Sequence, residues 1–155
     1  MELVIKVRLH VGINNVMFVQ MVSNLNEFLG NKTAKDIELF LEEKQIEFEK
    51  YFENKDYILE NYIVYNLHTM YMKALETRDL NKEISRLMIS YSLIKLFLIS
   101  TWTKNNGELV GEDIVNVLYC ISRMLEHDEP FIESLYRELK IKGYDTIGYL
   151  VTMIY

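Results

Sequence analysis

Three histidines, His10, His68 and His127, are the residues to consider first for metal binding or acid–base catalysis. They lie far apart in the chain, and none has a second histidine or a carboxylate at the helical spacing of a zinc motif such as His-Glu-x-x-His. The single cysteine, Cys120, excludes an internal disulfide and a thiolate cage. No glycine-rich phosphate loop and no Gly-x-Ser-x-Gly elbow occurs either. The sequence therefore predicts neither a catalytic centre nor a metal site in this chain.

Lys95 lies within the most apolar stretch of the chain, so its charge needs an explanation. An ammonium inside an apolar helix must reach solvent, find a counter-ion or lose its proton. Glu60 and Asn61 are the polar residues of the preceding aromatic segment. We expect Glu60 to pair with Lys95 and to fix the register of two helices. The alternative is that Lys95 only extends its ammonium to solvent.

A second polar group, Arg123 and His127, is spaced by four residues and would share one face of a helix. His127 would lie at the negative C-terminal end of that helix, where a cation caps it. Capping of the helix is a simpler interpretation of this pair than a ligand site is. The predicted structural polar cluster thus consists of Glu60, Asn61, Lys95, Arg123 and His127, and no cofactor-binding residue is assigned.

Helices must position these residues, because the composition favours helix over sheet. One proline and six glycines leave little material for the turns of a sheet protein. Apolar side chains cover every side of a central segment at about residues 84–102, which predicts a helix surrounded by other helices. We expect one all-α domain over residues 1–155, a bundle of about seven helices around that segment.

Local signals predict the ends of these helices. Thr33 stands three residues before Asp36 and would cap a helix, Asn54 or Asp56 would cap the next one, and Asp79 the central one. The first segment, 1–31, is less certain. Its residues 2–11 alternate between apolar and polar, and we interpret them as a helix, with a strand paired between two chains as the alternative.

The charge and the apolar runs limit the partners. A formal net charge of −6 leaves no excess of basic residues for nucleic acid or an anionic membrane. The longest apolar stretch, 87–102, is shorter than the about 20 residues of a membrane span, and residues 1–11 lack the apolar run of a signal peptide. One unpaired cysteine fits a reducing compartment. We expect a cytoplasmic protein that binds neither nucleic acid nor membrane.

Three segments resemble the C-terminal helical part of bacterial flagellin lysine-N-methylases. They are YILENYIVYN at 57–66, ISYSLIKLFLI at 89–99 and ISRMLEH at 121–127. Their order and spacing agree with that family from about residue 52 to the C-terminus. The pattern departs at 67–72, where LHTMYM replaces an expected aromatic-Pro-Phe.

The resemblance implies a helical fold and flagellin as a possible partner. Members of the family are described as transferring a methyl group from S-adenosylmethionine to flagellin lysines. They carry an N-terminal cysteine cluster expected to hold a metal or iron–sulfur centre, which this chain lacks. S-adenosylmethionine and the metal centre would therefore belong to the missing family region, and we expect no cofactor in this chain.

The sequence leaves three functions open. The first is a non-catalytic helical module that scaffolds a missing catalytic half or docks a protein. The second is the ligand-binding and dimerisation domain of a helical transcriptional regulator, although no basic DNA-reading head is present. The third is an independent enzyme whose site residues cannot be aligned from the sequence. A homodimer is compatible with each of them.

Overall fold

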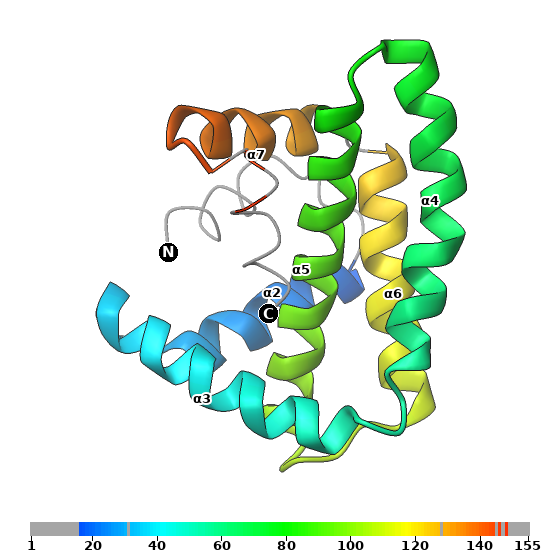
Figure 1. The fold of residues 1–155 in the computed structure, drawn as a ribbon. Helices are drawn as coiled ribbons and strands as arrows, with labels where there is room; N and C mark the ends of the chain where they lie inside the picture. The colour runs from blue at the N-terminus through cyan, green and yellow to red at the C-terminus, as the bar shows by residue number, and fades with distance from the viewer. Residues whose placement is uncertain (1–15, 31, 128, 145, 147, 149–155) are drawn as a thin grey trace.

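The computed structural model describes residues 16–30, 32–127, 129–144, 146 and 148 (Figure 1). Within these ranges the chain forms six α-helices and no strand, which confirms the predicted all-α bundle. The helices are α2 (Val16–Leu29), α3 (Ala34–Phe52), α4 (Tyr57–Thr77), α5 (Leu80–Lys104), α6 (Gly111–His127) and α7 (Glu129–Ile141). The segment 2–11, predicted to be a helix, lies outside the described residues. The described part thus holds six helices where about seven were predicted for the whole chain.

Helix α5 is the central element, as predicted for residues 84–102, and it contacts each of the other five described helices (Figure 1). Ile94, Ile99 and Ser100 are 0%, 4% and 1% exposed and project in three different directions around the helix axis, so α5 is enclosed on most sides. α5 has the length and mean hydropathy of a membrane-spanning helix, but more than half of its apolar window is buried. This combination is usual for the central helix of a bundle.

The helices begin where the local signals predict. The N–H of Asp36 donates to Thr33 Oγ1 at 3.3 Å before α3, and the N–H of Lys82 donates to Asp79 Oδ1 at 3.0 Å before α5. Asp56 accepts from the first amide of α4. Because a cap satisfies an amide within three residues in sequence, these boundaries could be predicted without knowing the packing.

An aromatic cluster fixes the C-terminal half of α3 to the end of α5. Phe48 stacks on Phe52 at 5.0 Å between ring centroids and meets Trp102 edge-on at 5.8 Å. The ring of Tyr51 lies 5.7 Å from that of Trp102. Its hydroxyl accepts from the N–H of Leu109 at 2.9 Å, so one side chain joins α3 to the loop between α5 and α6.

The Tyr51 hydroxyl also accepts a hydrogen bond from Lys55 Nζ at 3.0 Å. Burial raises the pKa of Tyr51, but the bonds from Lys55 and from the Leu109 amide outweigh it, and the pKa falls below its usual value. The hydroxyl accepts both bonds, and it pairs a backbone donor that the loop would otherwise leave without a partner.

Replacing Tyr51 by Phe should lower the free energy of unfolding by about 1–3 kcal/mol, because the ring stays while the Leu109 N–H loses its acceptor. Urea denaturation followed by circular dichroism measures this loss. Tyr65→Phe is the matched control, since Tyr65 is 78% exposed, and it should change the stability by less than about 0.5 kcal/mol. Equal effects of both variants would contradict the role of the Tyr51 hydroxyl.

Candidate functional site

Lys95 forms its ion pair with α3 instead of with α4. Its Nζ lies 2.7 Å from Glu49 Oε1, and the side chain of Lys95 is 9% exposed against 51% for Glu49. The predicted partner, Glu60, is exposed on α4, so the predicted Glu60–Lys95 pair is wrong. On this part of α4 Leu59 packs inward. The side chain of Glu60 projects about 100° away from that of Leu59 around the helix axis.

The geometry of Lys95 combines both interpretations made from the sequence. Its stem is buried among the helices, while its ammonium reaches a carboxylate at the surface. Glu49 follows Phe48, which is 1% exposed and anchors α3 beside α5. The counter-ion of Lys95 therefore comes from α3, the helix that packs on this face of α5. The order of residues in the sequence does not indicate this contact.

The other members of the predicted cluster lie apart from Lys95. Asn61 is exposed on α4. Arg123 is exposed on α6 and donates to the hydroxyl of Tyr119, one turn earlier on the same helix. The side chain of His127 lies outside the described part of the structure. No contact that joins these residues into one site is present in the described part.

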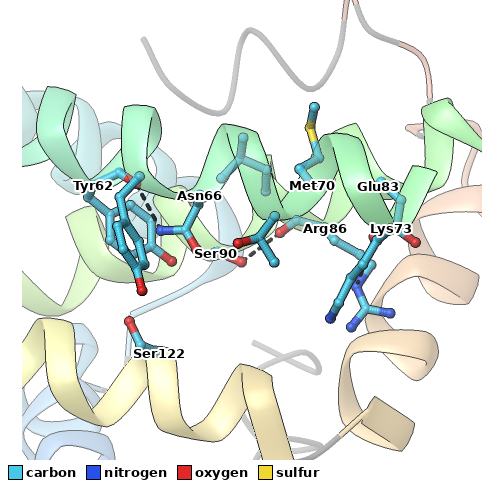
Figure 2. A pocket seen from close by; sticks show the side chains of 11 residues that line it. Tyr62, Asn66, Met70, Lys73, Glu83, Arg86, Ser90 and Ser122 are labelled. Atoms are coloured by element: carbon cyan, nitrogen blue, oxygen red, sulfur yellow. Dashed lines mark hydrogen bonds and ion pairs between the residues drawn. The ribbon is translucent and has the colours of Figure 1, made fainter. Parts of the chain in front are cut away.

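A cleft between α4 and α6, with α5 as its floor, is the candidate site that the sequence did not indicate (Figure 2). Its volume is about 140 Å³. Helix α4 contributes Tyr62, Tyr65, Asn66, Thr69, Met70 and Lys73, α5 contributes Glu83, Arg86, Leu87 and Ser90, and α6 contributes Ser122.

Small side chains at facing positions explain why this space is empty. Ser90 on α5 and Ser122 on α6 lie on helix faces where larger apolar residues would fill the interior (Figure 2). The hydroxyl of Ser90 donates to the carbonyl of Arg86 at 2.6 Å, and the amide of Asn66 donates to the carbonyl of Tyr62 at 2.8 Å. The only sequence signal was the presence of serines within apolar segments.

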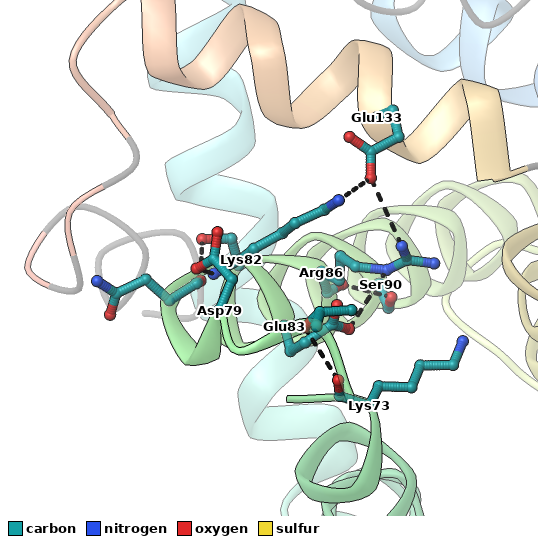
Figure 3. A network of polar contacts seen from close by, with 10 residues as sticks. Lys73, Asp79, Lys82, Glu83, Arg86, Ser90 and Glu133 are labelled. Atoms are coloured by element: carbon teal, nitrogen blue, oxygen red, sulfur yellow. Dashed lines mark hydrogen bonds and ion pairs between the residues drawn. The ribbon is translucent and has the colours of Figure 1, made fainter. Parts of the chain in front are cut away.

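Charged residues occupy one end of the cleft (Figure 3). Arg86 Nε lies 3.7 Å from Glu83 Oε2, and the side chain of Glu83 is only 4% exposed. Arg86 Nη1 also lies 3.7 Å from Glu133 Oε1 of α7, which Lys82 Nζ contacts at 2.5 Å. Because a buried carboxylate must be paired, Arg86 provides the partner that Glu83 needs, and the contact with Glu133 links α5 to α7.

The cleft carries a small excess of positive charge. Lys73 and Arg86 line it together with one carboxylate, Glu83. Among the described residues, Lys73 Nζ has no carboxylate within ion-pair distance. The amide, hydroxyl and cationic groups together can bind an acidic or amide side chain, or a carbonyl oxygen.

The size of the cleft restricts what it can hold. Small-molecule sites usually enclose about 300–1,000 Å³, whereas this cleft offers about 140 Å³. It therefore has room for one side chain and not for a whole cofactor. In the described ranges no three His, Cys, Asp or Glu residues come together as a metal site, and Cys120 is buried in the core.

The fold and the cleft define a helical domain that offers a polar recess between two helices. Comparison with protein families is more specific. A family model described as FliB lysine N-methylase C-terminal domain matches residues 1–153. The chain belongs to this family, and the match reaches further toward the N-terminus than the segments recognised in the sequence. No curated protein and no solved structure matches the chain.

Replacing Glu49 by Gln should lower the stability by about 1 kcal/mol, because a mostly buried ammonium loses a charged partner that is itself half-exposed. Glu60→Gln is the matched control and should change the stability by less than about 0.5 kcal/mol. Thermal unfolding of both variants measures the difference. A larger loss of stability from Glu60→Gln than from Glu49→Gln would contradict the Glu49–Lys95 pair and support the Glu60–Lys95 pair predicted from the sequence.

The contact of Lys82 with Glu133 predicts a stability that depends on pH. The hydrogen bond to Glu133 raises the pKa of Lys82 above its usual value of 10.5. The stabilisation is therefore complete below pH 10.5 and is lost as the pH rises through the higher pKa of the folded state. Glu133→Gln should cost about 1 kcal/mol at neutral pH. The free energy of unfolding of this variant should also fall less steeply with pH above pH 10.5 than that of the wild type. An equally steep fall in both proteins would contradict this account.

Proposed function

We propose that this domain is a non-catalytic helical part of a flagellin lysine-N-methylase system and that it docks a protein partner. The observation that supports docking is the cleft between α4 and α6, which has room for one side chain and is lined by polar and cationic groups. Membership of the C-terminal domain family supports the link to lysine methylation. Flagellin is the partner that the family resemblance suggests.

The chemistry of the cleft favours an acidic or amide side chain as the anchor. Lys73 gives a positive end beside the paired Arg86, and the second amide hydrogen of Asn66 and the hydroxyl of Ser122 can donate to the anchor. The hydrogen of the Ser90 hydroxyl is donated to the Arg86 carbonyl, so Ser90 can only accept. At the rim, Tyr65 is 78% exposed and offers a flat surface beside the anchor. Tyrosine and arginine are the residue types enriched where proteins bind one another.

The proposal leaves the methyl transfer itself to the cysteine-bearing region that the family resemblance implies, and not to residues 1–155. Members carry a cysteine cluster there, and the only cysteine of this chain is buried in the core. The present domain would act by holding the substrate protein or by supporting that catalytic region. The alternative, the ligand-binding domain of a helical regulator, needs a pocket several times larger than the cleft described here.

Binding of purified flagellin to this chain, measured by calorimetry or interferometry, tests the proposal. Lys73→Glu should weaken binding at least about tenfold, because it reverses the charge that attracts an acidic anchor. Ser122→Trp should have a similar effect by filling the cleft. Lys50→Glu changes the net charge equally at an exposed position of α3 and should leave binding unchanged.

Three results would contradict the proposal. They are the absence of binding to flagellin, wild-type affinity in the Lys73→Glu and Ser122→Trp variants, and a loss with Lys50→Glu as large as that with Lys73→Glu. A methyl-transfer assay with flagellin and S-adenosylmethionine is expected to show no product for this chain alone. Turnover by the chain would overturn the assignment of the chemistry to another region.

A further inference from the structure

The side of α4 that faces away from α5 is apolar and exposed. We define the outer face of α4 as Tyr57, Asn61, Val64, His68, Tyr71 and Leu75. Val64 is 66% exposed, Leu75 59% and Tyr71 58%. No residue of this face carries a full charge other than a protonated His68.

This distribution is unusual for a helix at the edge of a bundle. Figure 1 shows α4 on the outside of the molecule, where it packs mainly on α5. A surface helix normally buries one apolar stripe and exposes charged residues on the opposite side. Helix α4 buries Leu59 and Ala74 on its inner side and exposes a second apolar stripe on its outer side. An exposed, mostly apolar stripe of this kind normally marks a surface that another protein covers.

The shape and the exposed area of the outer face suit a second helix. Its six residues are separated alternately by four and three positions, so they form one continuous stripe along α4 against which another helix can lie. The stripe from Tyr57 to Leu75 is about 27 Å long. With the flanking Leu67 and Met72 it exposes on the order of 700 Å², close to the about 800 Å² that each partner buries in a stable protein–protein interface.

We propose that the outer face of α4 binds the same face of a second copy of this chain, with the two helices antiparallel. A two-fold interface must be complementary to itself. Antiparallel pairing about the middle of the stripe sets Tyr57 opposite Leu75, Asn61 opposite Tyr71, and Val64 opposite His68. Asn61 then meets a hydroxyl to which it can hydrogen-bond, and the apolar residues meet one another.

A parallel pair would be less favourable. It would place His68 against His68 and Asn61 against Asn61, and would align the two helix dipoles in the same direction. Antiparallel pairing avoids both effects. The interface does not depend on the proposed docking function, because the cleft opens on the side of α4 that faces α6.

Sedimentation equilibrium of the 155-residue chain tests the proposal. The chain is expected to be dimeric once its concentration reaches about 100 µM. Val64→Glu should weaken association at least about tenfold, because it buries a carboxylate at the centre of the seam. Its circular dichroism should remain that of the wild type, since Val64 is mostly exposed in the single chain. Val115→Glu on α6, at a residue 62% exposed, is the matched control and should remain dimeric.

A wild-type chain that stays monomeric would overturn the proposal and leave the outer face to a different protein. Persistence of the dimer in Val64→Glu, or its loss in Val115→Glu, would also overturn it. Flagellin binding by a dimer-deficient Val64→Glu chain would show that docking and dimerisation are separate. Dimerisation without flagellin binding would contradict only the docking function.

Disulfide formation tests the antiparallel orientation. A Val64→Cys chain mixed with a His68→Cys chain should give a cross-linked heterodimer on mild oxidation, because the two positions face each other across the two-fold axis. Each variant alone should cross-link much less. Cys120 is 1% exposed and does not compete in the folded protein. Efficient cross-linking of the Val64→Cys chain with itself would indicate a parallel pair and overturn the orientation.

Discussion

The enclosure of α5 is the constraint on which the rest of this structure depends. A 25-residue helix with apolar side chains on every side cannot face water, so other helices must surround it. Five described helices contact it, and between them they cover residues such as Ile94 and Leu98 completely. The positions of these five helices follow from the need to cover one central cylinder.

Polar groups on α5 show what that enclosure requires. Lys95 and Glu83 are carried into the interior by their places on the helix, and each is paired there with an oppositely charged side chain. Glu49 supplies the partner for Lys95 from α3, and Arg86 supplies the partner for Glu83 within α5. The Lys95–Glu49 pair joins α5 to α3, and Glu133 extends the second network to α7. The polar residues of the core therefore help to fix how the helices pack against one another.

Helix α4 has a different relation to the core. Its inner side covers α5, its side toward α6 forms one wall of the cleft, and its outer face is apolar and exposed. A helix with three such sides is suited to joining the bundle to other proteins. Helix α4 contributes residues both to the cleft of the proposed docking function and to the proposed pairing with a second copy. Helix α5 packs against the inner side of α4 and holds it in place.

The sequence by itself determined the helices and the central position of α5. Caps at Thr33 and Asp79 act within three residues, and an apolar cylinder is visible in the order of residues alone. It also carried the motifs that place the chain in its family. Only the tertiary structure decided that Glu49 is the partner of Lys95 and that Ser90 and Ser122 leave a cleft between helices. The physical reason is distance along the chain, because contacts between helices depend on rotation and crossing angle, which the packing of the whole bundle sets.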